Sequence, residues 1–231
     1  MKKIFLALFF VLISVFSFSS EIDQDNTKVE ISQVKDFDKI KGKTKKEIFI
    51  SVLVPIINEF KNEIEKERAL VEELSKKAEL NDEDNEFLEK KYTSYKVSSK
   101  SIKELLSKMV VPPTSLILAQ ASLESGWGTS KLAKEGNNLF GIRSTLKDPT
   151  RAVQTGKNSF YKKYSRISDS VADYIMTLCR HKSYEKLRVG ISKGEDSLSL
   201  TNHLANYSEA KQVYAKRLTN MIKGNSFQQY D

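Results

Sequence analysis

The sequence contains few residues of the types that build covalent or metal-held frameworks. Its 231 residues include one cysteine, Cys179, so the chain can form neither an internal disulfide nor a cysteine-based metal site. The only two histidines, His181 and His203, form no metal-binding pattern. We therefore expect no metal and no cofactor. The fold must be held by a hydrophobic core, in which Cys179 would take a small apolar place.

Glycine is also scarce, with nine residues, and no glycine-rich phosphate-binding loop appears. No Ser, His and Asp residues follow the spacing of a nucleophilic triad. The pattern therefore gives no support to a nucleotide-dependent enzyme or a serine hydrolase.

A long hydrophobic run occurs at the start of the chain. Two lysines precede an apolar stretch that ends near Phe16, and small residues follow up to Ser20. This pattern is typical of a secretory signal, and the stretch is shorter than the ~20 residues of a spanning helix. Residues 1–20 are therefore interpreted as a signal peptide, with an uncleaved anchor as the alternative. We expect an exported protein, in the periplasm, cell envelope or extracellular space, with membrane contact only through this signal if it is uncleaved.

The chain is basic, with 38 Lys and Arg against 30 Asp and Glu and a net charge of +8. Loss of the signal with its two lysines leaves +8 − 2 = +6. Such a charge suits an anionic partner, for example a cell-wall polymer, an anionic lipid or a nucleic acid. The lysines alternate with glutamates, however, which is typical of a solvated surface without a partner. Export and the mixed-sign surface argue against nucleic acid.

The first part of the mature chain predicts a linker at residues 21–45 and a helical extension at 46–110. Thr44 and Glu47 have the spacing of a capping box. Apolar residues then repeat every four positions from Ile48 to Ile64, which predicts a helix over about 45–77. Further helices are expected at about 81–95 and 98–109. A partner-binding coiled coil is the alternative, although the heptads are few.

Residues 111–225 predict a second, mainly helical unit with one β-containing excursion. Pro112 and Pro113 precede an apolar helix that carries Glu124. Turn residues and short strands are expected at about 141–166, where the excursion would form one wall of a cleft. Ser170 and Asp173 have capping-box spacing, which predicts a helix from there to about His181. Helices at 197–204 and 212–223 complete the pattern.

Glu124 is unusual because it ends an apolar helix, just before Gly126, Trp127 and Gly128. Apolar surroundings disfavour the charged form of a carboxyl group and raise its pKa. A raised pKa is what a general acid needs near neutral pH. The alternative is an ordinary helix-terminal glutamate that points into water.

Several runs in order resemble the bacterial glucosaminidases of glycoside hydrolase family 73. Residues 121–128 (ASLESGWG) resemble its A-x-x-E-S-x-W-G motif, and residues 136–141 (GNNLFG) its G-N-N-x-F-G motif. Residues 160–164 (FYKKY) with 170–174 (SVADY), and then His181 to Tyr184, resemble later motifs. The run Tyr207-Ser208-Glu209 with Tyr214, and the helical extension, resemble the Bax-like subgroup. The resemblance covers about residues 45–225.

This resemblance implies a mainly α, lysozyme-like α+β fold with a helical lobe, a small β-lobe and a sugar-binding groove between them. It implies an endo-beta-N-acetylglucosaminidase that cleaves β-1,4 bonds after N-acetylglucosamine in peptidoglycan glycan strands, with Glu124 as general acid. A lytic transglycosylase and a catalytically silent wall-binding module remain alternatives.

Glycoside cleavage also needs stabilisation of an oxocarbenium-like centre. Asp148 is the only carboxylate from residue 136 to 168, but an Asp before proline is often just a turn residue. Tyr207, by resemblance, lies near the acid, where its hydroxyl could orient the substrate amide; a half-buried tyrosine with an ordinary hydrogen bond is the alternative. The substrate's own N-acetyl group is the third candidate.

Candidate sugar-binding residues follow from the same motifs. Trp127 either stacks on a sugar or wedges the helix end against the β-lobe, and we favour the wedge. Asn138 is expected to shape a turn and line the groove. Tyr161 and Tyr164 are candidates for groove lining or packing. Tyr214 is interpreted as a packing residue.

Overall fold

The computed structural model describes residues 44–148, 151–207 and 211–231, and the side chains of 205–212 lie outside this description. The predicted signal peptide and nearly all of the predicted linker also lie outside it. The helices are α2 (Lys45–Leu74), α3 (Asp82–Ser94), α4 (Ile102–Lys108), α5 (Thr114–Ser125), α6 (Lys131–Gly136), α7 (Ile167–Arg180), α8 (Glu185–Ser192), α9 (Ser197–Leu200) and α10 (Lys211–Gly224). Short 3-10 helices are η1 (Lys182–Tyr184), η2 (Thr201–Tyr207) and η3 (Phe227–Tyr230), and the strands are β1 (Ala152–Gly156) and β2 (Ser159–Lys162).

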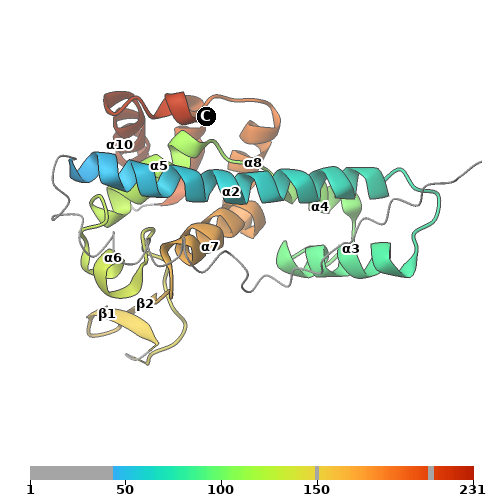
Figure 1. Cartoon of the computed structure of the whole chain (residues 1–231), viewed down its shortest axis with the longest axis horizontal. Coiled ribbons are helices and arrows are strands. Elements are labelled where there is room, and N and C mark those ends of the chain that lie inside the picture. The colour runs from blue at the N-terminus through green and yellow to red at the C-terminus, as the bar shows by residue number, and fades with distance from the viewer. Residues whose placement is uncertain (1–43, 149–150, 208–210) are drawn as a thin grey trace, which may run out of the picture.

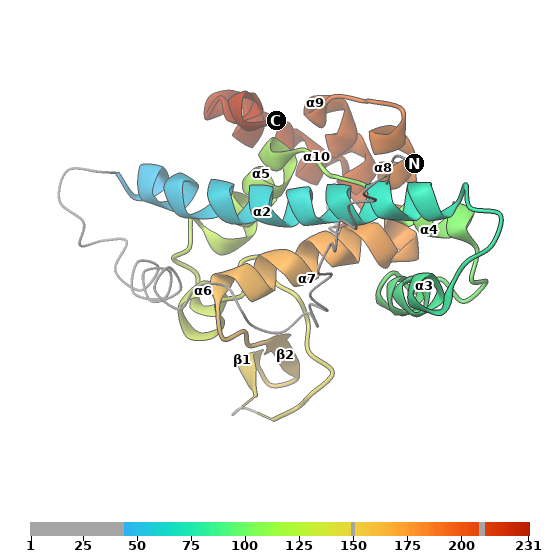
Figure 2. The same ribbon diagram turned by 45° about the vertical axis from the view of Figure 1, so that its right-hand side comes forward.

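Helix α2 runs along the length of the molecule (Figure 1). The predicted capping box is present, since Thr44 and Glu47 bond each other's backbone N–H groups. The apolar stripe is buried against α5 and α7, with Phe49, Leu53 and Ile57 at 1% exposure or less. Beyond these contacts α2 extends to α4, and α3 lies beside that end (Figure 2). The predicted extension therefore shares one hydrophobic core with the rest of the protein.

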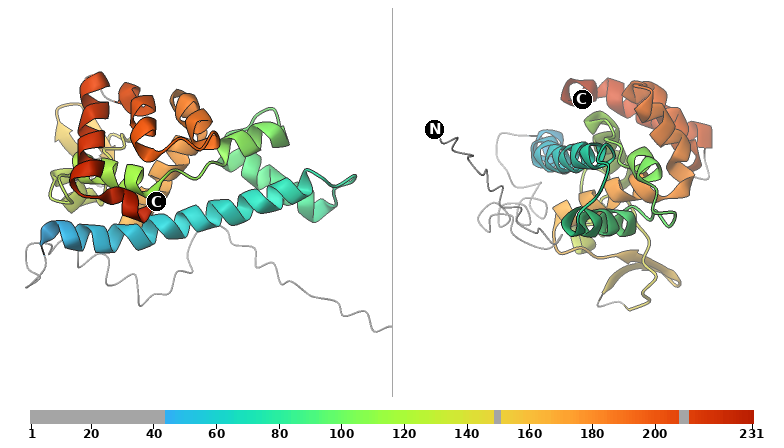
Figure 3. Two further views of the ribbon diagram at one scale, coloured as in Figure 1. Left: turned by 90° about the horizontal axis from the view of Figure 1, so that it is seen from above. Right: turned by 90° about the vertical axis from the view of Figure 1, so that its right-hand side faces the viewer.

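Helix α5 is buried on nearly all sides, which explains its continuous apolar sequence. It contacts α2, α9, α10 and η3 (Figure 3). Its first residue follows Pro113, which provides no side-chain cap. The carboxylate of Asp231 supplies one, since it accepts hydrogen bonds from the Ser115 N–H at 2.8 Å and the Ser115 hydroxyl at 2.7 Å. The end of the chain thus fixes the start of the helix that carries Glu124.

The β excursion is an antiparallel hairpin, β1 with β2, in which Val153 pairs with Tyr161. At the start of the expected excursion, about 141–166, the structure has one isolated bridge, Arg143 with Tyr161. A short helix that the sequence did not predict, α6, packs on β1. The close approach depends on Gly136, because a Cβ atom there would lie 2.6 Å from Val153 Cγ2.

Asp173 ties the hairpin to α7. Its carboxylate accepts hydrogen bonds from Lys162 Nζ and the Tyr164 hydroxyl, both at 2.7 Å, and from Arg180 at 3.0 Å. The predicted capping box that ends at Asp173 is therefore wrong. The helix begins one turn earlier, at Ile167, and Asp169 Oδ2 accepts from the Arg166 N–H at 3.1 Å.

The expected fold class, mainly α with a helical lobe, a small β-lobe and an N-terminal helical extension, is confirmed. Within the described residues, no helix combines the length and apolar character needed to cross a membrane.

Candidate active site

Glu124 lies in the last turn of α5, and its side chain is half-buried. Gly126 follows in a left-handed conformation with φ +56° and ends the helix, as glycine commonly does. Burial of the carboxyl group raises the pKa of Glu124 above its ordinary value, and a hydrogen bond with Tyr214 partly offsets the rise. The protonated form is therefore favoured at a higher pH than for an exposed glutamate.

Tyr214, from α10, forms a hydrogen bond with the Glu124 carboxyl group. Its side chain is 4% exposed, and its hydroxyl accepts a hydrogen bond from Gln120 Nε2 at 3.3 Å. Gln120 lies one turn before Glu124 on the same helix face and is fully buried. Because the Tyr214 hydroxyl oxygen accepts from Gln120, the hydroxyl proton is available for donation to the Glu124 carboxylate. Tyr214 is buried in the core, as its interpretation as a packing residue predicted, and it also forms a hydrogen bond with Glu124 that the sequence did not predict.

Tyr184, at the end of η1, lies close enough to Glu124 to interact with its charge. Burial, together with the nearby charge of Glu124, raises the pKa of Tyr184 to about 12. Its ring also meets His181 edge to face, with centroids 6.1 Å apart. Tyr184 therefore stays protonated at neutral pH, as an uncharged hydrogen-bonding group near the acid.

Trp127 packs with aromatic residues from both ends of the described chain. Its ring meets Phe49 of α2 and Phe227 of η3 edge to face, at centroid distances of 5.7 and 6.0 Å. Lys46 Nζ lies 4.9 Å from the ring centroid. Trp127 is therefore a wedge at the end of α5, as we favoured. Its ring contacts lie on α2 and η3, whereas we had expected contacts with the β-lobe.

Asn138 is 1% exposed, and its side-chain amide is used within the protein. The Nδ2 group donates to the carbonyls of Ile142 and Lys162, both at 2.9 Å, and Oδ1 accepts from the Ile142 N–H at 3.0 Å. Through these hydrogen bonds Asn138 connects the loop after α6 to strand β2. The predicted turn-shaping role fits these contacts, and the buried amide has no surface for a sugar.

Tyr161 and Tyr164 are both half-buried, on and just after β2. The Arg143 guanidinium lies 5.7 Å from the Tyr161 ring centroid. The Tyr164 hydroxyl is bonded to Asp173, and burial together with that carboxylate raises the pKa of Tyr164. Tyr164 therefore joins the two lobes, and Tyr161 stays a candidate for groove lining.

Asp148 and Tyr207 come from opposite parts of the fold. Asp148 lies half-buried in the loop between the Arg143 bridge and β1, and its carbonyl accepts from the Arg151 N–H at 3.0 Å. The Tyr207 backbone ends η2, which packs on α10, and its side chain lies outside the description. Across residues 44–148, 151–207 and 211–231, no group of three or more His, Cys, Asp and Glu side chains could hold a metal ion.

The sequence interpretation missed the roles of Gln120, Tyr184 and Tyr214. The four-residue spacing of Gln120 and Glu124 was a signal that could have revealed the first. The contacts of Tyr184 and Tyr214 depend on how η1 and α10 return to the end of α5, which no local pattern shows.

Glu124 is a protonatable carboxyl group, half-buried at a helix end near two tyrosines, in a helical protein with a small β hairpin. These features define a candidate acid-catalysed glycosidase. Comparison with known families agrees, because residues 99–227 match the glucosaminidase family (mannosyl-glycoprotein endo-beta-N-acetylglucosaminidase). This match covers more than half of the chain, which therefore belongs to this family of glycoside hydrolases.

Three curated relatives illustrate the similarity. The chain is 35% identical to protein bax of Escherichia coli over 127 residues, which are 52% of this chain and 46% of that protein. It is 30% identical to the peptidoglycan hydrolase FlgJ of Salmonella typhimurium over 134 residues (52% and 42%) and 34% identical to the exo-glucosaminidase LytG of Bacillus subtilis over 123 residues (49% and 41%). The matches thus span less than half the length of each relative.

Two solved structures are also similar. The catalytic domain of the autolysin Auto from Listeria monocytogenes matches with a TM-score of 0.42 and 22% identity, over 69% of this chain and 94% of that one. The glycoside hydrolase domain of Salmonella typhimurium FlgJ matches with a TM-score of 0.40 and 23% identity, over 62% and 90%.

Proposed function

We propose that this protein hydrolyses β-1,4 glycosidic bonds after N-acetylglucosamine in peptidoglycan, as an endo-beta-N-acetylglucosaminidase. The observation that carries the proposal is Glu124, a half-buried carboxyl group whose pKa is raised by burial, in a chain of the glucosaminidase family. The export signal proposed at residues 1–20 would bring the enzyme to this substrate in the cell envelope or outside the cell. The names of FlgJ and LytG, a peptidoglycan hydrolase and an exo-glucosaminidase, support the substrate class.

In this mechanism the protonated Glu124 donates its proton to the leaving glycosidic oxygen, and positive charge develops at the sugar carbon. Tyr214 keeps the carboxyl group oriented and stabilises the carboxylate that forms. Tyr184 is uncharged at neutral pH, because burial and the charge of Glu124 raise its pKa.

The second catalytic group is proposed from three candidates. Asp148 would act as a base, Tyr207 would orient the N-acetyl group, or that N-acetyl group would itself attack the sugar carbon. The position of Tyr207 at the end of η2, against the helix that carries Tyr214, favours the tyrosine. Asp148→Asn and Tyr207→Phe, assayed side by side, test this choice. A much larger loss of kcat in Tyr207→Phe is expected, and a loss confined to Asp148→Asn would assign the base to Asp148.

Digestion of purified sacculi tests the reaction itself. Sacculi are incubated with the full chain or with Glu124→Gln, and mass spectrometry reads the ends of the released fragments. We expect reducing N-acetylglucosamine ends from the wild type and none from Glu124→Gln. Anhydro ends would instead assign a lytic transglycosylase, and bound but intact sacculi with the wild type would assign a silent wall-binding module.

A further inference from the structure

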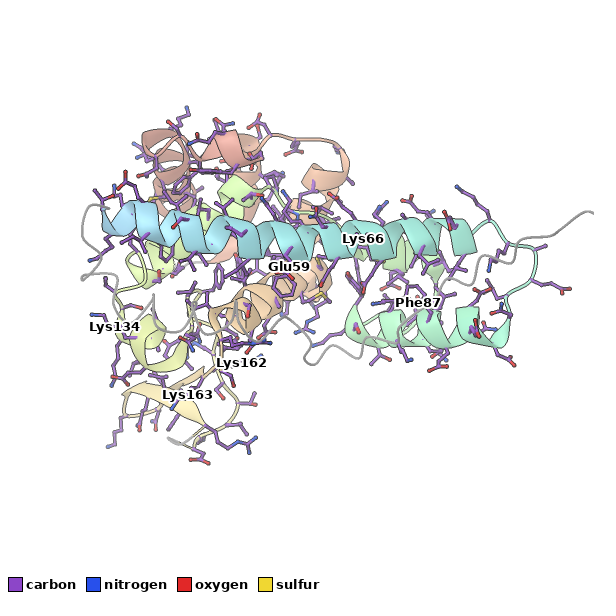
Figure 4. The ribbon with its side chains drawn as sticks, viewed as in Figure 1. Glu59, Lys66, Phe87, Lys134, Lys162 and Lys163 are labelled. Carbon is purple, nitrogen blue, oxygen red and sulfur yellow. The ribbon has the colours of Figure 1, made fainter. Side chains whose placement is uncertain are left out.

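The positive charge of this protein is concentrated in one segment. Residues 131–166, from α6 to the start of α7, contain nine Lys and Arg residues and two acidic residues, a net charge of +7. The other residues between 44 and 231 contain 22 basic and 22 acidic side chains and carry no net charge. In this segment the basic residues do not alternate with acidic ones, unlike those in the rest of the described range. Figure 4 shows Lys134 and Lys163 at the hairpin end of the molecule, far along it from Phe87 on α3.

A cavity of about 700 Å³, widely open to solvent, lies within this cationic segment, between α6 and β1. Lys131 and Glu135 line it from α6, residues 152–156 from β1, and Lys157 and Lys163 from the turn and the end of the hairpin. Lys157 and Lys163 are both exposed. Three cationic groups and one anionic group thus face one hollow, which favours a ligand with negative charge.

Strand β1 adds a second kind of recognition to the cavity. In the described sheet β1 pairs only with β2, while the Arg143 bridge lies on the other side of β2. Lys131 Nζ donates to the Gln154 carbonyl at 3.1 Å, so the β1 backbone already bonds groups on the α6 side. An edge strand offers backbone hydrogen bonds to an extended peptide.

We propose that the cavity between α6 and β1 binds the stem peptides of peptidoglycan, through their carboxylates and extended backbone. This inference rests on the proposed function, since it names the part of the wall that the β-lobe recognises. Lys157 and Lys163 attract the carboxylates, and Lys131 holds the wall of the cavity. Glu135, 3.9 Å from Lys131, opposes the ligand.

Binding measured with Glu124→Gln, which leaves the glycan intact, tests the proposal. The probes are soluble glycan strands with stem peptides, free of phosphate polymers, and the same strands after an amidase has removed the peptides. The Glu124→Gln protein should bind the peptide-bearing strands more tightly, and the difference should shrink with added salt. Equal affinity for the two probes would overturn the proposal.

Charge variants then locate the site. Adding Lys157→Gln and Lys163→Gln should weaken binding of peptide-bearing strands by about three- to tenfold, as expected for two exposed ion pairs. The matched control, Lys76→Gln with Lys103→Gln, removes the same charge from exposed positions at the other end of the molecule and should change the affinity much less. An equal loss in both pairs would assign the binding to overall charge.

Glu135→Gln provides a test of opposite sign that does not depend on losing a contact. It should tighten binding of the peptide-bearing strands, and weaker or unchanged binding would contradict the proposal. A phosphate-rich wall polymer is the competing ligand. The cavity would be assigned to phosphate if this polymer bound more tightly than the peptide-bearing strands and lost the same affinity in the Lys157 and Lys163 variant. Because Glu124→Gln is used throughout, failure here leaves the hydrolysis test untouched. Peptide-dependent binding by a wild-type protein that does not cleave would reject only the proposed activity.

Discussion

Replacing Tyr214 by phenylalanine removes one hydroxyl group from the site of Glu124 and keeps the ring that packs in the core. The hydroxyl lowers the pKa of Glu124, against the larger effect of burial, because it stabilises the charged carboxylate. Without it, the pKa of Glu124 must rise further. A hydrogen bond to a charged group contributes about 1.5–3 kcal/mol, and about 1.4 kcal/mol corresponds to a tenfold change in an ionisation constant.

A general acid works only while it is protonated, so the rate falls when the pH exceeds its pKa. In Tyr214→Phe the alkaline limb of the kcat/KM profile should therefore move to higher pH, by about one to two units. The assay follows the cleavage of soluble glycan strands across this limb for the wild type and the variant. An unmoved limb, or one displaced to lower pH, would refute the hydrogen bond as a determinant of the acid.

The same substitution should also lower stability, because it leaves the buried Gln120 Nε2 without its partner. An unsatisfied buried donor costs about 1–3 kcal/mol, measurable by chemical denaturation. Tyr92→Phe is the control, since Tyr92 is a buried tyrosine on α3, away from this network. It should leave the pH limb in place.

Two further predictions concern stability and pH. Burial raises the folded-state pKa of Glu124, so the charged form of this residue destabilises the fold above that pKa. At neutral pH, Glu124→Gln should therefore unfold at a higher temperature than the wild type. This gain should disappear below the ordinary value of 4.5, and a variant less stable than the wild type at neutral pH would contradict it. Burial opposes ionisation of Asp173, but hydrogen bonds from Lys162 and Tyr164 outweigh it and lower its pKa. Asp173→Asn should therefore cost about 1–3 kcal/mol of unfolding free energy at neutral pH, and the cost should vanish as the pH falls below the ordinary value of 3.8; a pH-independent difference would show that the charge does not matter.

Local patterns predicted the long helices because those patterns are themselves the cause of the structure. Helix α2 has an apolar stripe of helical period and a capping box, and it forms from Lys45 to Leu74, close to the predicted 45–77. Helices α6 and α8 were missed because six and eight residues are too short for a periodic stripe to stand out.

The site was predicted to the extent that it depends on one helix. Glu124 was found because its apolar neighbours and the following glycines are adjacent in sequence. The contact of Tyr214 with Glu124 was not predicted, because it spans 90 positions of the chain and depends on how α10 packs on α5. Asp173 was assigned to a helix start because its spacing from Ser170 matches a capping box. Its hydrogen-bond partners Lys162 and Tyr164 instead belong to the end of the hairpin, which the local spacing does not reveal.

The position of Glu124 along its helix supports its proposed role as an acid. Glu104, in the first turn of α4, shows the opposite case: hydrogen bonds from Lys108 and Ser99 lower its pKa, and a helix start also favours negative charge. Glu124 is half-buried in the last turn of α5, which contains no basic residue and lies at the negative end of the helix dipole. Burial and this position both disfavour the carboxylate, and the hydrogen bond with Tyr214 favours it. One hydroxyl group can therefore set the pH range of the acid without changing the helix that carries it.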